Sequence, residues 1–223
     1  DDIFNNSGDI AIETAGGTGI SLGSDDNVFT NSGTVTIGKA NCSGIVLCSG
    51  DNIFTNSGTV TIDAANNYGI FLGSDEGDAT FTNSGSITIG AAHCDSGIRL
   101  SSGANTLTNE ESGTIYIGKA YENGIQMGSG ATSLINAGII TIDLVRDEDG
   151  INMDTSDGTY PDVLNNSGTI TIGSVGDDGI DFEPDDMGDT LINSGTITMG
   201  TILDDGFDFG HDENSGDHQF TNT

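Results

Sequence analysis

Residues 29–47 read Phe29-Thr-Asn-Ser-Gly-Thr-Val-Thr-Ile-Gly-Lys-Ala-Asn-Cys-Ser-Gly-Ile-Val-Leu47, and variants of this stretch recur along the whole chain. Two glycines mark each copy. The first, in the motif Asn-Ser-Gly-Thr, lies at Gly8, Gly33, Gly58, Gly85, Gly113, Gly138, Gly168 and Gly195. The second, which an apolar residue follows, lies at Gly19, Gly44, Gly69, Gly97, Gly124, Gly150, Gly179 and Gly206. Successive copies of the first glycine are 25 to 30 residues apart, so we interpret the chain as a repeat protein.

Three short runs in each repeat alternate apolar and polar residues, as half-buried strands do. In the quoted copy they centre on Phe29, on Val35 and Ile37, and on Ile45 and Leu47. Three strands are too few for a propeller blade, and no helical period separates them as in leucine-rich or βαβ units. We therefore predict an all-β fold, a single domain over residues 1–223. It should be a right-handed, three-sided parallel β-solenoid (β-helix) of about eight coils, each of 25–30 residues.

In such a fold each coil rises by about 4.8 Å, the spacing of hydrogen-bonded strands, so that like residues stack on like. An asparagine column should occupy one corner and form an amide ladder, in which each side chain bonds to the next. Its members are Asn6, Asn31, Asn56, Asn83, Asn109, Asn136, Asn166, Asn193 and Asn222. The chain begins and finishes within the same strand of the repeat, so we expect a segment of a longer solenoid or a subunit that stacks head to tail.

The chain is strongly acidic, with 35 Asp and Glu against 4 Lys and Arg and a formal net charge of -31. Such a surface repels phosphate and anionic lipid, which argues against nucleic acid as a partner. No apolar run approaches the ~20 residues of a membrane-spanning helix, so we expect no membrane insertion of this segment. Residues 143–223 hold 20 of the 35 acidic residues, and we call them the acidic C-terminal coils.

Alignment of the third strands stacks polar residues of neighbouring coils. Asp149, Asp178 and Asp205 fall in one column, Asn152, Asp181 and Asp208 fall in the next, and Glu183 follows in the adjoining turn. Stacked carboxylates repel one another unless a proton or a cation intervenes. Calcium takes about six to eight oxygen ligands in irregular geometry, so we predict that these residues bind structural calcium. The Gly-Gly-x-Gly-x-Asp calcium motif is absent, and a solvated acidic face adapted to salt water is the alternative.

Threonines occupy the outward positions of several second strands. They are Thr34, Thr36, Thr59, Thr61, Thr88, Thr169, Thr171, Thr196 and Thr198. A flat Thr-x-Thr array on a β-solenoid is similar to the ice-binding face of some antifreeze proteins. Tyr116 and Ile139 interrupt the array, and Thr is favoured on exposed strands in any case, because it is β-branched and polar.

Two further surface features suggest a function. Acidic pairs such as Asp178 and Asp181 are similar to the acid and base of polysaccharide-active β-helix enzymes. The basic residues that such enzymes use to hold uronate are scattered here, so we expect no enzyme and assign no catalytic residue. Tyr68, Phe71 and Tyr121 are expected to point outward and to form a small adhesive patch or a contact between rods.

The recurring Asn-Ser-Gly-Thr-Ile-Thr-Ile-Gly and Gly-Ile-x-Leu-Gly units resemble the repeats of autotransporter passenger domains and of filamentous-haemagglutinin-like surface proteins of Gram-negative bacteria. This resemblance implies a secreted stalk, filament, surface-layer subunit or adhesin without a cofactor-dependent active site. The implied location is extracellular or on the surface of a bacterium. The implied partners are the chain itself, through head-to-tail or lateral association, and surface glycans or a host or neighbouring cell surface.

Overall fold

The computed structural model describes residues 1–73, 77–153, 160–182, 188–210 and 217–223. These residues form 25 strands and no helix, so the chain is all-β, as predicted. Nothing in this described part is a helix of the length and apolar character needed to cross a membrane.

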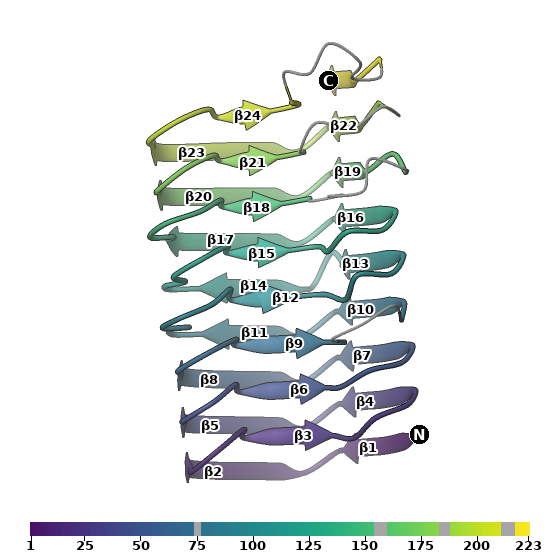
Figure 1. Cartoon of the computed structure of the whole chain (residues 1–223), viewed down its shortest axis with the longest axis vertical. Coiled ribbons are helices and arrows are strands. Elements are labelled where there is room, and N and C mark those ends of the chain that lie inside the picture. Colours follow the sequence, from purple (N-terminus) through teal and green to yellow (C-terminus); the bar gives the residue numbers. More distant parts are fainter. Residues whose placement is uncertain (74–76, 154–159, 183–187, 211–216) are drawn as a thin grey trace.

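The strands form three parallel sheets, and each sheet takes one strand from every coil (Figure 1). The first sheet has nine strands: β1 (Asp2–Asn6), β4 (Asn27–Asn31), β7 (Asn52–Asn56), β10 (Ala79–Asn83), β13 (Asn105–Asn109), β16 (Thr132–Asn136), β19 (Val163–Asn166), β22 (Thr190–Asn193) and β25 (Gln219–Asn222). The second has eight: β2 (Asp9–Ala15), β5 (Thr34–Ala40), β8 (Thr59–Ala65), β11 (Ser86–Ile89), β14 (Thr114–Ile117), β17 (Ile139–Leu144), β20 (Thr169–Val175) and β23 (Thr196–Ile202). The third also has eight: β3 (Ile20–Leu22), β6 (Ile45–Leu47), β9 (Ile70–Leu72), β12 (Ile98–Arg99), β15 (Ile125–Gln126), β18 (Ile151–Asn152), β21 (Ile180–Asp181) and β24 (Phe207–Asp208).

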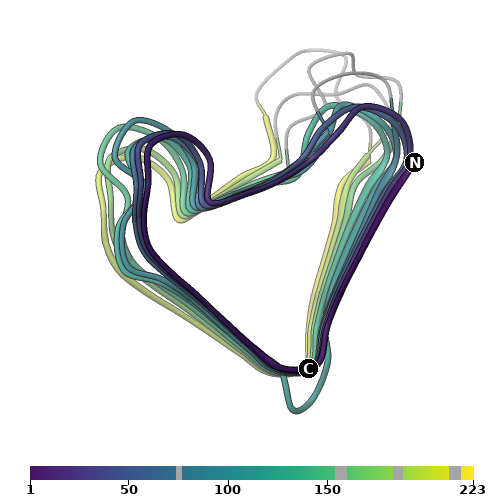
Figure 2. The same ribbon diagram turned by 90° about the horizontal axis from the view of Figure 1, so that it is seen from below.

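One coil is one set of three consecutive strands, from coil one (β1–β3) to coil eight (β22–β24), and β25 follows. In Figure 1 each coil runs along the back through the first and second sheets, returns along the front through the third, and rises, which makes the solenoid right-handed. Figure 2 shows three sides in cross-section, with the side of the third sheet indented. The predicted three-sided solenoid of about eight coils is confirmed, and at about 4.8 Å a coil its length is roughly 40 Å.

The interior is filled by the inward residues of all three sheets. Phe29, Phe54 and Phe81 are fully buried, and the ring centroids of successive phenylalanines are 4.6 Å apart. Leu107 pairs with Phe81 and continues this column into coil five. Burial of a side chain of this size stabilises the fold by about 1.5–3 kcal/mol. Because the strands are in register, each apolar residue packs against its counterpart in the coils above and below.

The predicted asparagine ladder is confirmed at the corner between the first and second sheets. From Asn6 to Asn222, each Nδ2 donates to the Oδ1 of the asparagine on the next coil, at 2.7–2.9 Å. The same Nδ2 atoms also donate to turn carbonyls, as Asn31 does to Thr59 at 3.1 Å. The ladder thus satisfies a column of buried amides and ties each turn to the next.

The two glycine markers lie where stacked backbones leave no room for a side chain. A Cβ atom on Gly33 would lie 2.1 Å from the carbonyl oxygen of Gly8, and one on Gly44 would lie 2.6 Å from that of Gly69. Real Cβ atoms essentially never approach other atoms closer than 3.0 Å. Glycine therefore recurs at these positions because the turns of neighbouring coils touch there.

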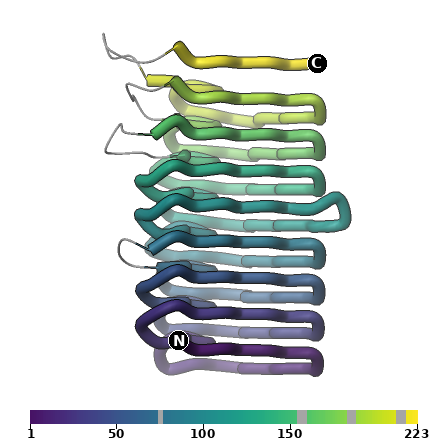
Figure 3. Tube along the Cα trace, turned by 90° about the vertical axis from the view of Figure 1, so that its right-hand side faces the viewer, coloured from purple at the N-terminus to yellow at the C-terminus, as the bar shows by residue number. Residues whose placement is uncertain are grey.

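Variation in repeat length is absorbed by turns. Figure 3 shows that the teal turn of coil five projects beyond the others. Glu110 and Glu111 are inserted there between Asn109 and Ser112. Asn109 nevertheless donates to Asn136 at 2.9 Å, so the insertion leaves the ladder intact.

Candidate functional site

Polar residues gather on the third sheet of coils six to eight and on the turn that precedes it. We call the following residues the acidic cluster: Asp149, Asn152, Asp177, Asp178, Asp181, Asp204, Asp205 and Asp208. Asn152, Asp181 and Asp208 lie in β18, β21 and β24, and the strands pair with these three residues in register, as the alignment predicted. Asn152 and Asp181 are each only 6% exposed although they face away from the core, because this side of the solenoid is indented (Figure 2).

The column before the marker glycine forms a second type of ladder, in which side chains bond to backbone. The N–H of Asp149 donates to Oδ1 of Asn123 at 3.0 Å, and the N–H of Asp178 donates to Oδ1 of Asp149 at 3.0 Å. The N–H of Asp205 donates to Oδ1 of Asp178 at 2.6 Å. Each of these side chains therefore fixes the turn of the coil above it.

Asn152 connects the two columns. Its Nδ2 donates to Oδ2 of Asp149 at 2.9 Å and to Oδ2 of Asp181 at 3.1 Å. Both oxygens of Asp149 thus accept hydrogen bonds within the protein. We interpret Asp149 and Asn152 as residues that hold the neighbouring carboxylates in position.

The environment disfavours negative charge on two members of the cluster. Burial raises the pKa of Asp149 from 3.8 to about 6, against the hydrogen bonds from Asn152 and from the Asp178 N–H, which lower it. Burial likewise raises the pKa of Asp178 to about 6, and the carboxylates of Asp149, Asp177 and Asp208 raise it further. Burial, which is the largest cause at both residues, therefore outweighs the hydrogen bonds that stabilise the charged forms of Asp149 and Asp178.

Carboxylate oxygens converge at two points in the cluster. Asp178, Asp181 and Asp208 each present one oxygen, and these three atoms lie within 4.8 Å of one another. Asp177, Asp178 and Asp204 form a second group with the same maximum separation. Asp178 belongs to both groups, so the two share a ligand.

The structure therefore brings together three of the seven predicted metal ligands in a single group. Asp205 belongs to neither group, and Glu183 lies outside the described residues. Sequence analysis missed Asp177 and Asp204. The pairs Asp177-Asp178 and Asp204-Asp205 occur at the same position of the repeat, and this recurrence is the signal that would have identified them.

Basic side chains elsewhere in the chain do not offset this charge. Coils seven and eight contain no Lys or Arg. The nearest arginine in sequence, Arg146, lies 3.5 Å from Asp147 and stacks on the ring of Tyr121 at 4.9 Å. An arrangement of oxygen ligands with surplus negative charge is the chemistry that calcium prefers.

The three predicted adhesive residues do not form one patch. Tyr68 and Phe71 stack in coil three with ring centroids 4.7 Å apart. Nη1 of Arg99 donates to the hydroxyl of Tyr68 at 3.0 Å, and its guanidinium lies over both rings. Tyr121 lies two coils away in coil five and contacts Arg146 instead. The aromatic patch therefore consists of Tyr68, Phe71 and Arg99.

The nine predicted threonines of the second sheet lie in two columns, and the strands that carry them pair in register. Thr36, Thr61 and Thr88 form one run on coils two to four, and beyond Tyr116 the column resumes with Thr141, Thr171 and Thr198 on coils six to eight. Tyr116 follows Thr88 in the column and donates to Oδ2 of Asp143 at 2.5 Å. The Thr-x-Thr face is thus divided into two parts.

A further polar column, at the start of the first-sheet strands, was not predicted. Asp162 and Asp189 are fully buried there, and the N–H of Asp162 donates to Oδ1 of Asp189 at 2.9 Å. Nδ1 of His218 accepts from the N–H of Asp189 at 3.0 Å and lies 3.2 Å from Oδ2 of the same residue. In the lower coils asparagine occupies this column: the N–H of Asp2 donates to Oδ1 of Asn27 at 3.2 Å, and Nδ2 of Asn27 donates to Oδ1 of Asn52 at 3.0 Å.

Comparisons with known proteins identify no relative of this chain. No family model matches the chain, and the searches of curated proteins and of solved structures give no match.

Proposed function

We propose that the chain is a structural rod of an extracellular bacterial surface and that calcium bound by the acidic cluster stabilises its C-terminal coils. The observation that carries the proposal is the convergence of the Asp178, Asp181 and Asp208 carboxylates within 4.8 Å. Carboxylates at this separation repel unless a proton or a cation lies between them. Calcium suits the group better than magnesium, because calcium tolerates irregular oxygen geometry whereas magnesium demands a near-ideal octahedron.

The proposed role as a stalk, filament, surface-layer subunit or adhesin is supported by the rod shape of the solenoid and by the resemblance of its repeats to those of bacterial surface proteins. A solenoid with a filled interior presents its outer faces for contact along its whole length. The aromatic patch of Tyr68, Phe71 and Arg99 is half-buried, and its accessible ring surface suits contact with surface glycans or with a neighbouring cell. The extracellular bacterial location rests on the resemblance of the repeat to passenger domains and filamentous-haemagglutinin-like proteins.

Self-association is supported by the strand edges at the two ends. Among the described strands, β1 pairs with β4 alone and β25 pairs with β22 alone. Phe220 in β25 is 57% exposed, although its column is buried in the middle coils. An open strand edge is a template for another strand, which is supplied by a further coil of a longer chain or by a second copy.

Calcium binding is tested by isothermal titration of the metal-free chain with calcium, and then with magnesium. We expect calcium to bind more tightly than magnesium. Asp181→Asn and Asp208→Asn should each weaken calcium binding at least about tenfold, because each removes one charge from the ligand group. Asp63→Asn changes an exposed acid on the second sheet and serves as the matched control. At a free calcium concentration 100 times Kd, the unfolding free energy should rise by about 2.7 kcal/mol.

Sedimentation velocity, with calcium and then with chelator, tests assembly separately. Formation of rods with calcium supports the filament, and a monomer in both conditions contradicts self-association of this chain. Equal affinity of the control and the two Asn variants would contradict the metal site. Hydrolysis of a polysaccharide that is lost in Asp181→Asn would favour the polysaccharide-active enzyme instead.

Ice binding is a second candidate, supported by the in-register Thr columns of the second sheet. It requires thermal hysteresis in solution. Thr61→Tyr would place a bulky ring in the middle of the uninterrupted run on coils two to four, as Tyr116 does in coil five. Hysteresis that is present in the natural chain and lost in Thr61→Tyr would establish this function, and absence of hysteresis would eliminate it.

A further inference from the structure

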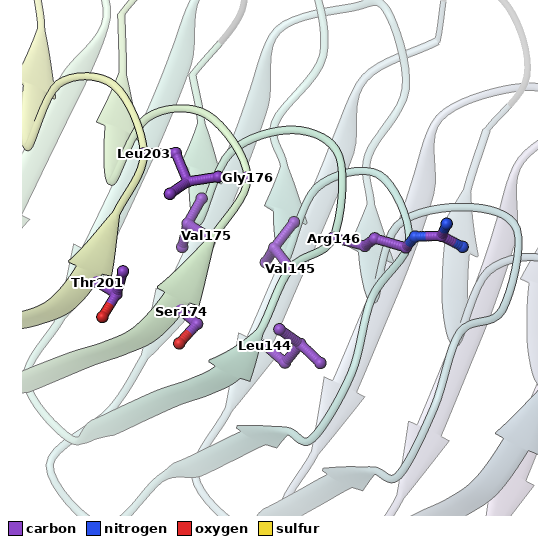
Figure 4. Close-up of a pocket in the computed structure, with 8 residues that line it drawn as sticks. All are labelled: Leu144, Val145, Arg146, Ser174, Val175, Gly176, Thr201 and Leu203. Atoms are coloured by element: carbon purple, nitrogen blue, oxygen red, sulfur yellow. The ribbon is translucent and has the colours of Figure 1, made fainter.

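The corner between the second and third sheets carries an apolar notch on coils six to eight (Figure 4). The notch has a volume of about 210 Å³. Leu144 of coil six and Leu203 of coil eight form its walls, and Val145 and Val175 form its floor. The two leucines are 40% and 73% exposed, which is unusual for large aliphatic side chains on so polar a surface.

The notch lies where coil seven has the small residues Ser174 and Gly176, beside Leu144 of coil six and Leu203 of coil eight. Ser174 pairs with Leu144 on one side and with Thr201 on the other. Gly176 lies against the backbone of Arg146, where a Cβ atom would come within 2.2 Å of the arginine carbonyl oxygen. The gap therefore lies at coil seven, and its volume of about 210 Å³ leaves room for an aliphatic side chain such as that of leucine.

An acidic edge, formed by aspartates that follow the lining residues in sequence, adjoins the notch, and Arg146 is the charged residue among those that line it. Each lining segment is followed in sequence by an aspartate: Asp147 after Arg146, Asp177 after Gly176, and Asp204 after Leu203. Asp177 and Asp204 are exposed, and each presents a carboxylate oxygen within 4.8 Å of the other. An apolar pocket beside a row of carboxylates is complementary to an aliphatic side chain flanked by lysine or arginine.

We propose that this notch docks a cationic segment of another protein, with one leucine-like side chain inserted between Leu144 and Leu203 and basic residues along Asp177 and Asp204. The chain itself offers no such segment. Its four basic residues are Lys39, Arg99, Lys119 and Arg146, and none is adjacent to another. A second copy with the same net charge of -31 would be repelled from this acidic edge. Charge complementarity therefore selects a different, basic partner.

The test uses the whole chain in chelator, so that its result does not depend on the calcium site. The probe is a fluorescein-labelled Lys-Lys-Leu-Lys-Lys peptide, compared with Lys-Lys-Gly-Lys-Lys by fluorescence anisotropy. We expect the leucine peptide to bind about tenfold more tightly, as burial of an aliphatic side chain implies, and both peptides to weaken with added salt. The double variant Asp177→Asn with Asp204→Asn should weaken both peptides.

Variants that fill the notch distinguish binding of the leucine side chain in the notch from attraction of the peptide by charge alone. Ser174→Leu fills it from an exposed position and should abolish the preference for the leucine peptide. Ala64→Leu makes a comparable change at the same corner position of coil three and should preserve the preference. Leu203→Ser removes one exposed wall and should reduce the preference without any change in the core.

Four outcomes would overturn the proposal. Equal binding of the two peptides would show that the surface attracts cations only by charge, and a preference that survives both Ser174→Leu and Leu203→Ser would place the contact elsewhere. No binding of either peptide would also refute it. Self-association of the natural chain that Ser174→Leu abolishes would identify a second copy as the occupant.

Discussion

Replacement of Asp149 by asparagine should stabilise the folded chain at neutral pH when calcium is absent. Oδ1 of Asp149 accepts the N–H of Asp178 at 3.0 Å, and an asparagine Oδ1 can accept the same bond. The coil below shows this arrangement, because Oδ1 of Asn123 accepts the N–H of Asp149 at the same distance. The substitution therefore keeps the bond to the Asp178 N–H and removes the buried charge, but it loses the hydrogen bond that Oδ2 accepts from Nδ2 of Asn152 at 2.9 Å.

The magnitude follows from the pKa of Asp149, which burial raises from 3.8 to about 6. One pKa unit corresponds to about 1.4 kcal/mol, so ionisation of Asp149 costs the fold up to about 3 kcal/mol above pH 6. Because the folded pKa lies above the unfolded one, the folded chain takes up the proton first as the pH falls. The natural chain should gain stability as the pH falls from about 6 to 4, and lose it as the pH rises through that range.

The assay is urea denaturation in chelator at a series of pH values between about 4 and 8. Asp149→Asn should raise the unfolding free energy at pH 7 by up to about 2 kcal/mol, which is the relief of the buried charge less about 1 kcal/mol for the lost bond from Asn152, and it should flatten the dependence on pH. Asp63→Asn, at an exposed position, controls for the general effect of removing one negative charge from this acidic chain. If Asp149→Asn is no more stabilising at pH 7 than Asp63→Asn, burial does not disfavour this charge and the reasoning is wrong.

Three further substitutions test the fold by the same denaturation measurement. Asn166→Ala breaks the amide ladder and should lower the unfolding free energy by about 2–4 kcal/mol, because it leaves buried polar groups without partners. Asn165→Ala, at the exposed neighbouring position, should lower it by less than about 0.5 kcal/mol. Gly69→Ala places a Cβ atom 2.6 Å from the Gly97 carbonyl oxygen and should strongly destabilise the fold. Gly206→Ala, whose Cβ atom would have no neighbour closer than 3.7 Å, should be tolerated. Equal loss of stability in the two variants would contradict the backbone contact. Phe81→Ala empties part of the stacked column and should cost about 3–5 kcal/mol; a smaller loss would mean that the column collapses around the gap.

The predictable part of the fold rests on local rules that act identically in every coil. Alternation places Phe29, Val35 and Ile37 inward, and a repeat that returns in register must stack each residue on its copy. The asparagine ladder follows from the same register, since a buried amide in a column has its counterpart about 4.8 Å away as a partner. The predicted pairing of Asn152, Asp181 and Asp208 was correct for the same reason.

The predictions from sequence were wrong or incomplete where the position of a side chain depends on the shape of the solenoid in cross-section. Tyr121 was grouped with Tyr68 and Phe71, which stack on each other, but its ring packs on Arg146, a contact that the path of the corner turn decides. Asp177 and Asp204 were not recognised, although their pairs with Asp178 and Asp205 recur in the sequence; their convergence with Asp178 depends on how the turn bends toward the adjoining strand. The apolar notch was missed because it arises from side chains that coil seven lacks, and only the packed neighbours reveal such a gap.

The amino-acid sequence by itself determined the solenoid, its register and the columns that stabilise it, because periodic side chains and a constant strand spacing allow a single consistent stacking. The tertiary structure alone decided the burial of Asp149 and Asp181, the convergence of carboxylates at Asp178 and the notch beside Asp177. These features depend on the indentation of the third sheet and on the path of its corner turn (Figure 2). Solvent exposure and distances between carboxylates are properties of that three-dimensional path, and the order of residues along one strand does not specify them.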